Sequence, residues 1–249
     1  MKKISFNILY WHGVDSENRI KNIKFCWDKI NKFVEYANLK GIEIKAFLFD
    51  FSEDKILEDS IHIPYKNGEY KRSEKMNKVI EYNYNNYSPE IFCCLDSDIF
   101  FIESEYDKLI NELNNFDNNS MEICSVLDIQ IKDQIDYEHN TFRVNQIAVK
   151  PRLMAGLGAF FIIGFNNIFN IGGFDERFIC WGGEDDDIGE RLNKNGIKKL
   201  YTSVQLFHLP HETLSNDSMS SDQYKNQCKL IGKNDIITKH SLITSKYLK

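Results

Sequence analysis

Long hydrophobic runs are missing from the chain. The longest, from Ala159 to Phe165, has the length of a β-strand, whereas a membrane-spanning helix needs about 20 apolar residues. At the amino terminus two lysines precede the apolar stretch Ile4 to Trp11, as in a signal peptide, but Asn7 interrupts it and no small-residue cleavage site follows. The sequence therefore predicts a first β-strand there, in a protein that stays in the cytosol.

The six cysteines lack the CxxC spacing of zinc and redox sites, so we expect reduced structural thiols. An excess of basic residues is also missing, because 31 Lys and Arg face 37 Asp and Glu for a net charge of −6. This balance argues against a surface that binds nucleic acid. Internal repeats and low-complexity linkers are absent, and 249 residues predict one domain with at most a small elaboration.

The charge is unevenly distributed along the chain. Residues 222–249 carry +4, which leaves −10 for residues 1–221. We expect 1–221 to form the folded domain and 222–249 to form a basic tail. The tail is either solvated or rests on an anionic membrane surface through its lysines, which are Lys225, Lys229, Lys233, Lys239, Lys246 and Lys249.

The first half of the chain alternates predicted strands and helices. Apolar residues at three- and four-residue spacing predict helices around 20–34, 72–84 and 106–113, the last with Ser104 as its N-cap. Strands are predicted at 4–11, 42–50, 61–63 and 91–95. Strands that alternate with helices are typical of a mostly parallel α/β sheet.

The second half is expected to share this sheet. Strands are predicted at 121–127, 159–163 and 197–204, and a helix around Ile188 and Leu192 ends at Gly196.

Two aspartates follow the most apolar strand. Asp96 and Asp98 lie directly after Ile91–Leu95 and before Ile99–Ile102, and ligands in open α/β sheets bind outside such strand ends. A DxD sequence also occurs in solvated turns, but carboxylates within so apolar a segment need a neutralising partner. The spacing suits two oxygen ligands for Mg²⁺ or Mn²⁺, with a diphosphate completing the coordination.

A second acidic cluster follows a tryptophan and two glycines. Glu184–Asp187 open a helix, whose dipole accounts for one or two carboxylates but not for four. Their repulsion favours a raised pKa in one member, as suits a general base. Gly182 and Gly183 let the backbone approach a ligand, and the Trp181 indole offers a flat face for a sugar ring, unless it is a core residue.

The run Trp-Gly-Gly-Glu-Asp-Asp-Asp at 181–187, after Gly-Gly-Phe-Asp at 172–175 and an earlier DxD, resembles the metal-dependent nucleotide-sugar glycosyltransferases of the GT-A fold. The motifs are most similar to animal galactosyltransferases that extend N-acetylglucosamine or xylose, and to bacterial chondroitin-polymerase-like and capsule-type family 2 enzymes. The resemblance spans about residues 4–211. It implies a Rossmann-like nucleotide-sugar-binding half over about 1–102 and an acceptor-binding, catalytic half over 103–221.

The resemblance also implies roles for the carboxylates. Asp98 would bind the metal, and Asp96 would lie near the ribose or the metal. Glu184 would hydrogen-bond the acceptor and Asp185 would act as the inverting base.

Further binding residues are implied on both sides of the reaction. Gly158 resembles a glycine of the sugar site, and Trp181, Gly182, Gly183 and Asp186 would contact the substrate.

Three positions match the donor side of the family less tightly. Arg72 and Asn77 carry over from its Arg-Ser-Lys-Ala-x-Asn segment, and a basic residue suits a diphosphate. Asp50, at the end of the second strand, is a candidate for the uracil or ribose contact and equally for a turn residue.

Two histidines follow the last predicted strand, where the resembling enzymes have a metal-binding histidine. His208 and His211 fit this position equally well. Imidazole with a DxD favours Mn²⁺ over Mg²⁺.

The resemblance implies an inverting transferase that moves a hexose or N-acetylhexosamine from UDP-galactose, UDP-N-acetylgalactosamine or UDP-glucose onto a glycan or lipid-linked glycan. Bacterial surface polysaccharide or lipooligosaccharide synthesis is the expected setting. Two alternatives remain: a glycoside hydrolase, which needs two carboxylates but no nucleotide, and a non-catalytic, Ca²⁺-dependent carbohydrate-binding module that uses the acidic cluster.

Overall fold

A computed structural model describes residues 2–11, 16–65, 71–129, 135–142, 149–151, 158–179, 183–211, 221–233 and 235. Its strands are β1 (Ile4–Tyr10), β2 (Ile44–Asp50), β3 (Ile61–His62), β4 (Ile91–Asp96), β5 (Ile99–Phe100), β6 (Ser120–Ile129), β7 (Ile135–Asp136), β8 (Thr141–Phe142), β9 (Val149–Pro151), β10 (Phe160–Gly164) and β11 (Lys198–His208). Its helices are α1 (Ser16–Leu39), α2 (Arg72–Asn86), α3 (Tyr106–Asn115), α4 (Phe165–Asn170), α5 (Glu184–Lys194) and α6 (Ser221–Cys228), with a 3₁₀ turn at Glu103–Glu105.

The central sheet has nine strands in the order β3-β2-β1-β4-β10-β6-β11-β5, and β9 pairs with β6 at its side. The strands β3, β2, β1 and β4 run parallel, as do β6 and β11, while β10 lies antiparallel between β4 and β6. The predicted mostly parallel α/β sheet is therefore confirmed, and both halves of the chain contribute to it.

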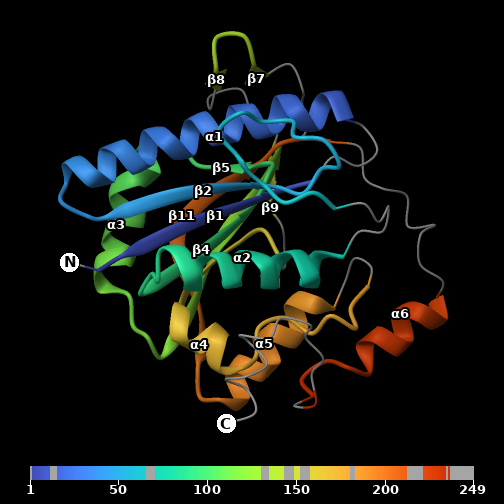
Figure 1. The fold of residues 1–249 in the computed structure, drawn as a ribbon. Coiled ribbons are helices and arrows are strands. Elements are labelled where there is room, and N and C mark those ends of the chain that lie inside the picture. The colour runs from blue at the N-terminus through green and yellow to red at the C-terminus, as the bar shows by residue number, and fades with distance from the viewer. Residues whose placement is uncertain are drawn as a thin grey trace.

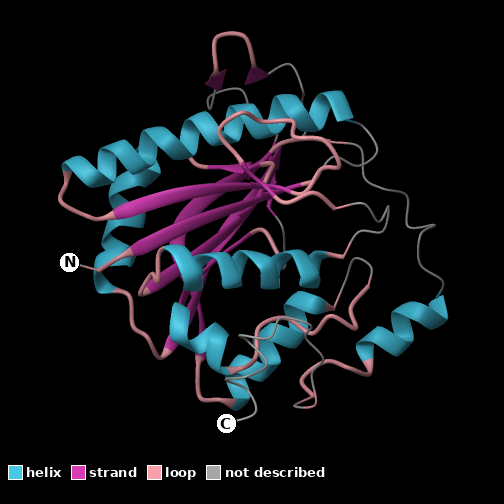
Figure 2. Cartoon of the chain, viewed as in Figure 1, coloured by secondary structure: helices cyan, strands magenta, loops and turns pink. Residues whose placement is uncertain are grey.

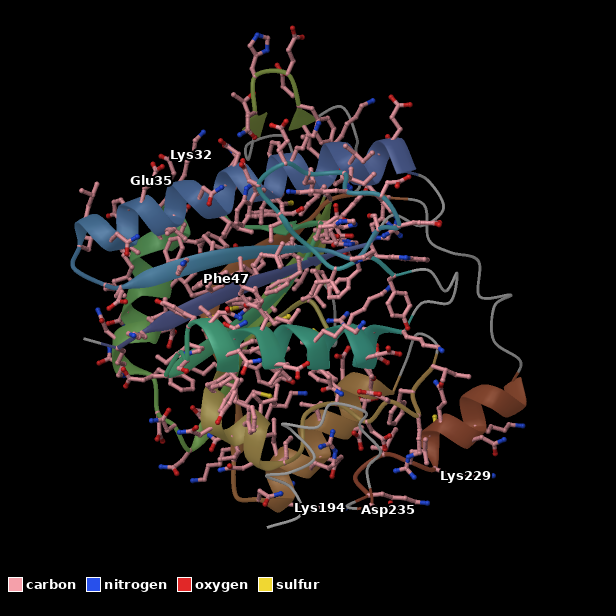
Figure 3. All side chains as sticks on the ribbon, in the orientation of Figure 1. Lys32, Glu35, Phe47, Lys194, Lys229 and Asp235 are labelled. Atoms are coloured by element: carbon pink, nitrogen blue, oxygen red, sulfur yellow. The ribbon has the colours of Figure 1, made fainter. Side chains whose placement is uncertain are left out.

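Helices cover both faces of the sheet (Figures 1 and 2). On one face α1 and α3 pack on the strands, and the Phe33 ring of α1 lies 5.5 Å from that of Phe6 in β1. On the other face α2, α4 and α5 form a second cluster, to which Phe47 of β2 points and where it meets Tyr82 edge-on at 5.7 Å (Figure 3). Because both faces are buried, β1 and β4 read as nearly continuous apolar runs.

The predicted capping of α3 by Ser104 is wrong. Residues 103–105 form a 3₁₀ turn, and Glu105 takes the N-cap position without a side-chain capping bond. The buried Glu105 carboxylate instead accepts the backbone N–H of Gln205 at 2.9 Å and binds Lys108. The turn is thus tied to β11, a contact that local sequence does not reveal.

The parallel strands end at one edge of the sheet. In register, Asp50 lies beside Tyr10, Asp96 beside Leu9, and His208 beside Asp128. Polar residues from β2, β4, β6 and β11 therefore gather at the carboxyl edge, where ligands bind in open α/β sheets.

Part of the predicted basic tail packs on the domain. The helix α6 places the Gln227 carboxamide oxygen 3.0 Å from the backbone N–H of Ile179. The Gly232 N–H then donates to Asp187 of α5 at 2.9 Å, and Lys194 of α5 donates to the Gly232 carbonyl. Figure 3 shows Lys194, Lys229 and Asp235 on this side of the molecule. Lys239, Lys246 and Lys249 lie outside the described residues, so the membrane contact stays a prediction.

Within the described residues, no helix combines the length and the apolar character needed to cross a membrane. Cys26, Cys93, Cys94, Cys124 and Cys228 are free thiols. Cys180 lies outside the described part of the chain.

Candidate active site

The DxD segment forms a tight turn at the carboxyl edge of the sheet. Asp96 is the last residue of β4, and Ser97 and Asp98 turn the chain into β5. The Asp98 carbonyl accepts the N–H of Leu209 at 2.9 Å, which joins this turn to the chain segment that follows β11. Asp98 is thereby placed beside the two histidines on either side of Leu209.

Asp98, His208 and His211 form a group able to hold a metal ion. One ligand atom from each lies within 4.8 Å of the others. The His208 Nε2 is 3.6 Å from Asp98 Oδ1, and the His211 Nε2 is 3.2 Å from Asp98 Oδ2. A carboxylate and two imidazoles suit Mn²⁺ and similar transition metals, so these residues fit the predicted ion. The geometry brings both histidines to Asp98, whereas the sequence left the choice between them open.

The surroundings of Asp98 favour its ionised form. Burial by itself would raise its pKa, but the nearby His208 ring, 3.6 Å away, and the charges of both histidines and Arg19 lower the pKa to about 2. The carboxylate is thus negative over the physiological range, as a metal ligand must be.

A second group centres on Arg72 at the start of α2. Its Nη1 lies 3.0 Å from Asp96 Oδ1, and its Nη2 donates to the Gly158 carbonyl at 2.8 Å. A Cβ on Gly158 would lie 2.6 Å from Asp185 Oδ2 and 3.7 Å from Arg72 Nη1. Arg72, Asp96, Gly158 and Asp185 therefore meet although they are distant in sequence. Asp96 does not belong to the Asp98–His208–His211 group. Its carboxylate instead forms an ion pair with Arg72.

Both acids of the Arg72 group bind protons more tightly than usual. Burial raises the pKa of Asp96, and the negative charges of Asp98 and Asp185 raise it as well. The positive charge of Arg72 acts in the opposite direction, and the resulting pKa is about 7. Burial also raises the pKa of Asp185. The charge of Arg72 lowers this pKa and the charge of Asp186 raises it. Asp185 Oδ1 is buried and has no hydrogen-bond partner among the described residues.

The four acids at the start of α5 have different surroundings. Glu184 is buried, Asp185 faces Gly158, and Asp186 is exposed. Asp187 is fully buried and pairs with Arg191 at 2.7 Å, while Arg191 also donates to the carbonyls of Ile171 and Gly173 at 2.8 Å. Arg191, held in place by Asp187, therefore fixes the helix to the preceding turn.

Gly183 gives α5 its starting geometry. It is the N-cap residue with a φ of 93°, and a Cβ there would lie 3.0 Å from the Phe178 ring. Trp181 and Gly182 lie outside the described residues, so their predicted substrate contacts stay predictions.

Asn77 and Asp50 make contacts typical of structural residues. Asn77 exchanges hydrogen bonds of 2.8 Å with the backbone of Phe174 and so fixes the segment that leads to α5. The Asp50 carboxylate accepts the N–H groups of Ser52 and Ile56 at 2.9 and 2.7 Å, as expected for the turn residue that the sequence allowed. Their predicted donor contacts stay predictions.

The sequence prediction missed Asp128, Arg191 and the structural part played by Asp187. Asp128 comes near the carboxyl end of β6, so the rule that drew attention to Asp98 would also have found it. Arg191 lies four residues after Asp187, the spacing of a helical ion pair.

Residues 142–213 match the family model described as the N-terminal domain of galactosyltransferase. This segment contains Gly158, the acids of α5 and both histidines. A search of curated proteins finds no match.

Two solved structures are similar over most of this chain. The catalytic domain of Drosophila beta1,4galactosyltransferase 7, in complex with xylobiose, is 12% identical with a TM-score of 0.51, over 96% of this chain and 82% of that chain. GalNAc-T7, with UDP, GalNAc and Mn²⁺, is 13% identical with a TM-score of 0.56, over 93% of this chain and 48% of that chain. This chain thus spans about half of the GalNAc-T7 chain. The likeness shows that the protein has the GT-A fold, the α/β architecture of these glycosyltransferases.

Proposed function

We propose that the protein is a metal-dependent glycosyltransferase that moves a hexose or N-acetylhexosamine from a UDP-sugar to a hydroxyl group of a glycan, with inversion. The observation that carries the proposal is the meeting of Asp98, His208 and His211 at the sheet edge that also holds Arg72 and Asp185. The galactosyltransferase family match and the ligands of the similar structures, UDP, GalNAc, Mn²⁺ and xylobiose, support it.

Asp98, His208 and His211 would hold the ion, and two imidazoles favour Mn²⁺ over Mg²⁺. When bound, the ion stabilises the negative charge of the departing diphosphate. The donor diphosphate would lie beside the DxD aspartates and Arg72, whose Nη1 is 3.0 Å from Asp96 Oδ1. Arg72 orients the donor by its planar, permanently charged guanidinium.

Asp185 is the proposed general base. The acceptor oxygen forms a bond to the anomeric carbon while the bond from that carbon to the diphosphate oxygen breaks, and the hydroxyl proton passes to Asp185. Its buried Oδ1, for which the described part of the chain offers no hydrogen-bond partner, and its raised pKa suit a group that takes up a proton.

The acceptor would lie against the start of α5. Glu184 would hydrogen-bond it, with Trp181, Gly182, Gly183 and Asp186 as further contacts. A glycan of a bacterial surface polysaccharide or lipooligosaccharide fits the proposal, with the enzyme in the cytoplasm at the inner face of the membrane when the acceptor is lipid-linked. The described tail has three exposed lysines, Lys225, Lys229 and Lys233.

Thermal unfolding with Mn²⁺ and UDP-galactose, UDP-N-acetylgalactosamine or UDP-glucose tests the proposal. At 100 times its Kd a ligand stabilises by about 2.7 kcal/mol, so one donor should raise Tm by about 5–10 °C. EDTA should abolish the shift, and UDP release should follow only when the shift occurs. A shift with Ca²⁺ alone and no UDP release would instead identify a binding module. Glycoside hydrolysis without nucleotide would identify a hydrolase.

Gly158→Ala tests the close approach of Asp185. The new Cβ would lie 2.6 Å from Asp185 Oδ2, so the carboxylate must move. Since a misplacement of about 1 Å can cost as much as 100-fold in rate, we expect kcat to fall about 10-fold or more. Steady-state kinetics of UDP release measure the loss. Gly41→Ala controls for a general loss of stability, because a Cβ there meets nothing within 4 Å but the φ of +82° strains the backbone before β2, and its kcat should stay at the wild-type value. An unchanged kcat in Gly158→Ala would show that Asp185 does not need this position.

A further inference from the structure

A carboxylate on β6 contacts a proposed metal ligand. Asp128 Oδ1 lies 2.9 Å from His208 Nδ1. The two residues are direct neighbours in the parallel register of β6 and β11. Their contact therefore follows from the pairing of two central strands, and not from a chance meeting of surface side chains.

The contact determines which ring nitrogen of His208 faces the metal group. A carboxylate oxygen accepts hydrogen bonds from a ring N–H, so we assign the Nδ1–H of His208 as the donor to Asp128. The other nitrogen, Nε2, then points to Asp98 at 3.6 Å. Because metal binding needs an unprotonated ring nitrogen, the Asp128 bond reserves Nε2 for the ion.

The loop between the histidines is held from α1 as well. Asn22 donates to the Pro210 carbonyl at 3.3 Å, and its own side-chain oxygen accepts the Tyr137 hydroxyl at 2.6 Å. Asn22 itself is 2% exposed, and both bonds are partly buried. Asn22 thus anchors the backbone between His208 and His211, and the Asp128 bond adds a contact to the His208 ring itself.

We propose that Asp128 is a positioning residue that fixes the tautomer and ring orientation of His208 and thereby raises the affinity for the metal. The proposal rests on the metal-dependent function proposed above. Loss of a residue that orients a metal-binding histidine typically lowers the metal affinity by about 10–100-fold.

The test is Mn²⁺ affinity, measured from the EPR signal of free Mn²⁺ without any donor sugar. Asp128→Ala should raise the Kd about 10–100-fold. Asp128→Asn keeps an acceptor oxygen, so its Mn²⁺ affinity should fall less than that of Asp128→Ala. Asp136→Ala is the matched control, since Asp136 pairs with His139 at 2.8 Å on the exposed β7–β8 hairpin, and it should bind Mn²⁺ as the wild type does. If Asp128→Ala does not fold, the Asn variant carries the comparison.

A second readout needs no metal. In nitrogen NMR of the metal-free protein, the Nδ1 proton of His208 should be protected from exchange in the wild type and lose this protection in Asp128→Ala. Wild-type Mn²⁺ affinity in Asp128→Ala would overturn the positioning role and leave the proposed function standing. An equal loss of affinity in Asp136→Ala would also overturn the positioning role. A wild-type protein that binds no Mn²⁺ would overturn both.

Discussion

Asp185→Asn should lower the transfer rate about 10²–10⁴-fold, the contribution of a general base. The amide has the shape of the carboxylate but cannot take the acceptor proton. Arg72 keeps its contact with Asp96 in the variant, so the donor side of the site stays intact. We therefore expect kcat to fall, while the thermal shift with Mn²⁺ and UDP-sugar stays as in the wild type.

Glu190→Gln is the matched control, because it makes the same carboxylate-to-amide change on an exposed position of the same helix. Its kcat should equal that of the wild type. Retention of most activity by Asp185→Asn would remove Asp185 from the role of base. Loss of donor binding in that variant would show that Asp185 acts on the donor.

Asp98→Ala should remove Mn²⁺-dependent stabilisation and activity together. Asp98 is the only carboxylate of the metal-competent group found among the described residues, and both histidines are placed around it. Without it the remaining ligands are two imidazoles, which carry no negative charge. We expect the Mn²⁺ Kd to rise more than about 100-fold, beyond the effect of a residue that only orients a ligand.

Calorimetric titration with Mn²⁺ and thermal unfolding with and without EDTA measure this change. Asp59→Ala, at an exposed position, should behave as the wild type. Mn²⁺ binding of wild-type strength in Asp98→Ala would place the ion elsewhere. A variant that binds Mn²⁺ weakly but keeps full activity would contradict metal-dependent transfer.

Most helices and strands could be predicted from the sequence, because their apolar residues follow regular spacings or continuous runs. The apolar spacing of 20–34 and 72–84 predicts two helices that the structure contains as α1 and α2. Continuous apolar runs predict β1 and β4 as strands covered on both faces. The equally short β3 was predicted at 61–63, but the short strands β5, β7, β8 and β9 were missed, because two or three residues carry little periodicity.

The sequence by itself determined the alternation of strands and helices and the chemical types gathered after the strands: the DxD, the acidic run after Trp-Gly-Gly, and the paired histidines. These are local properties, since periodicity and spacing are set within a few residues.

Only the tertiary structure decided which of these groups meet. It separates Asp96, which pairs with Arg72, from Asp98, which faces both histidines. It divides the acids of α5 between Asp185, which faces Gly158, and Asp187, which holds Arg191 and the Gly232 N–H. It also brings Asp128 to His208. The physical reason is that each contact joins separate strands or helices, so it depends on strand order and register in the sheet, which no single segment of the chain contains.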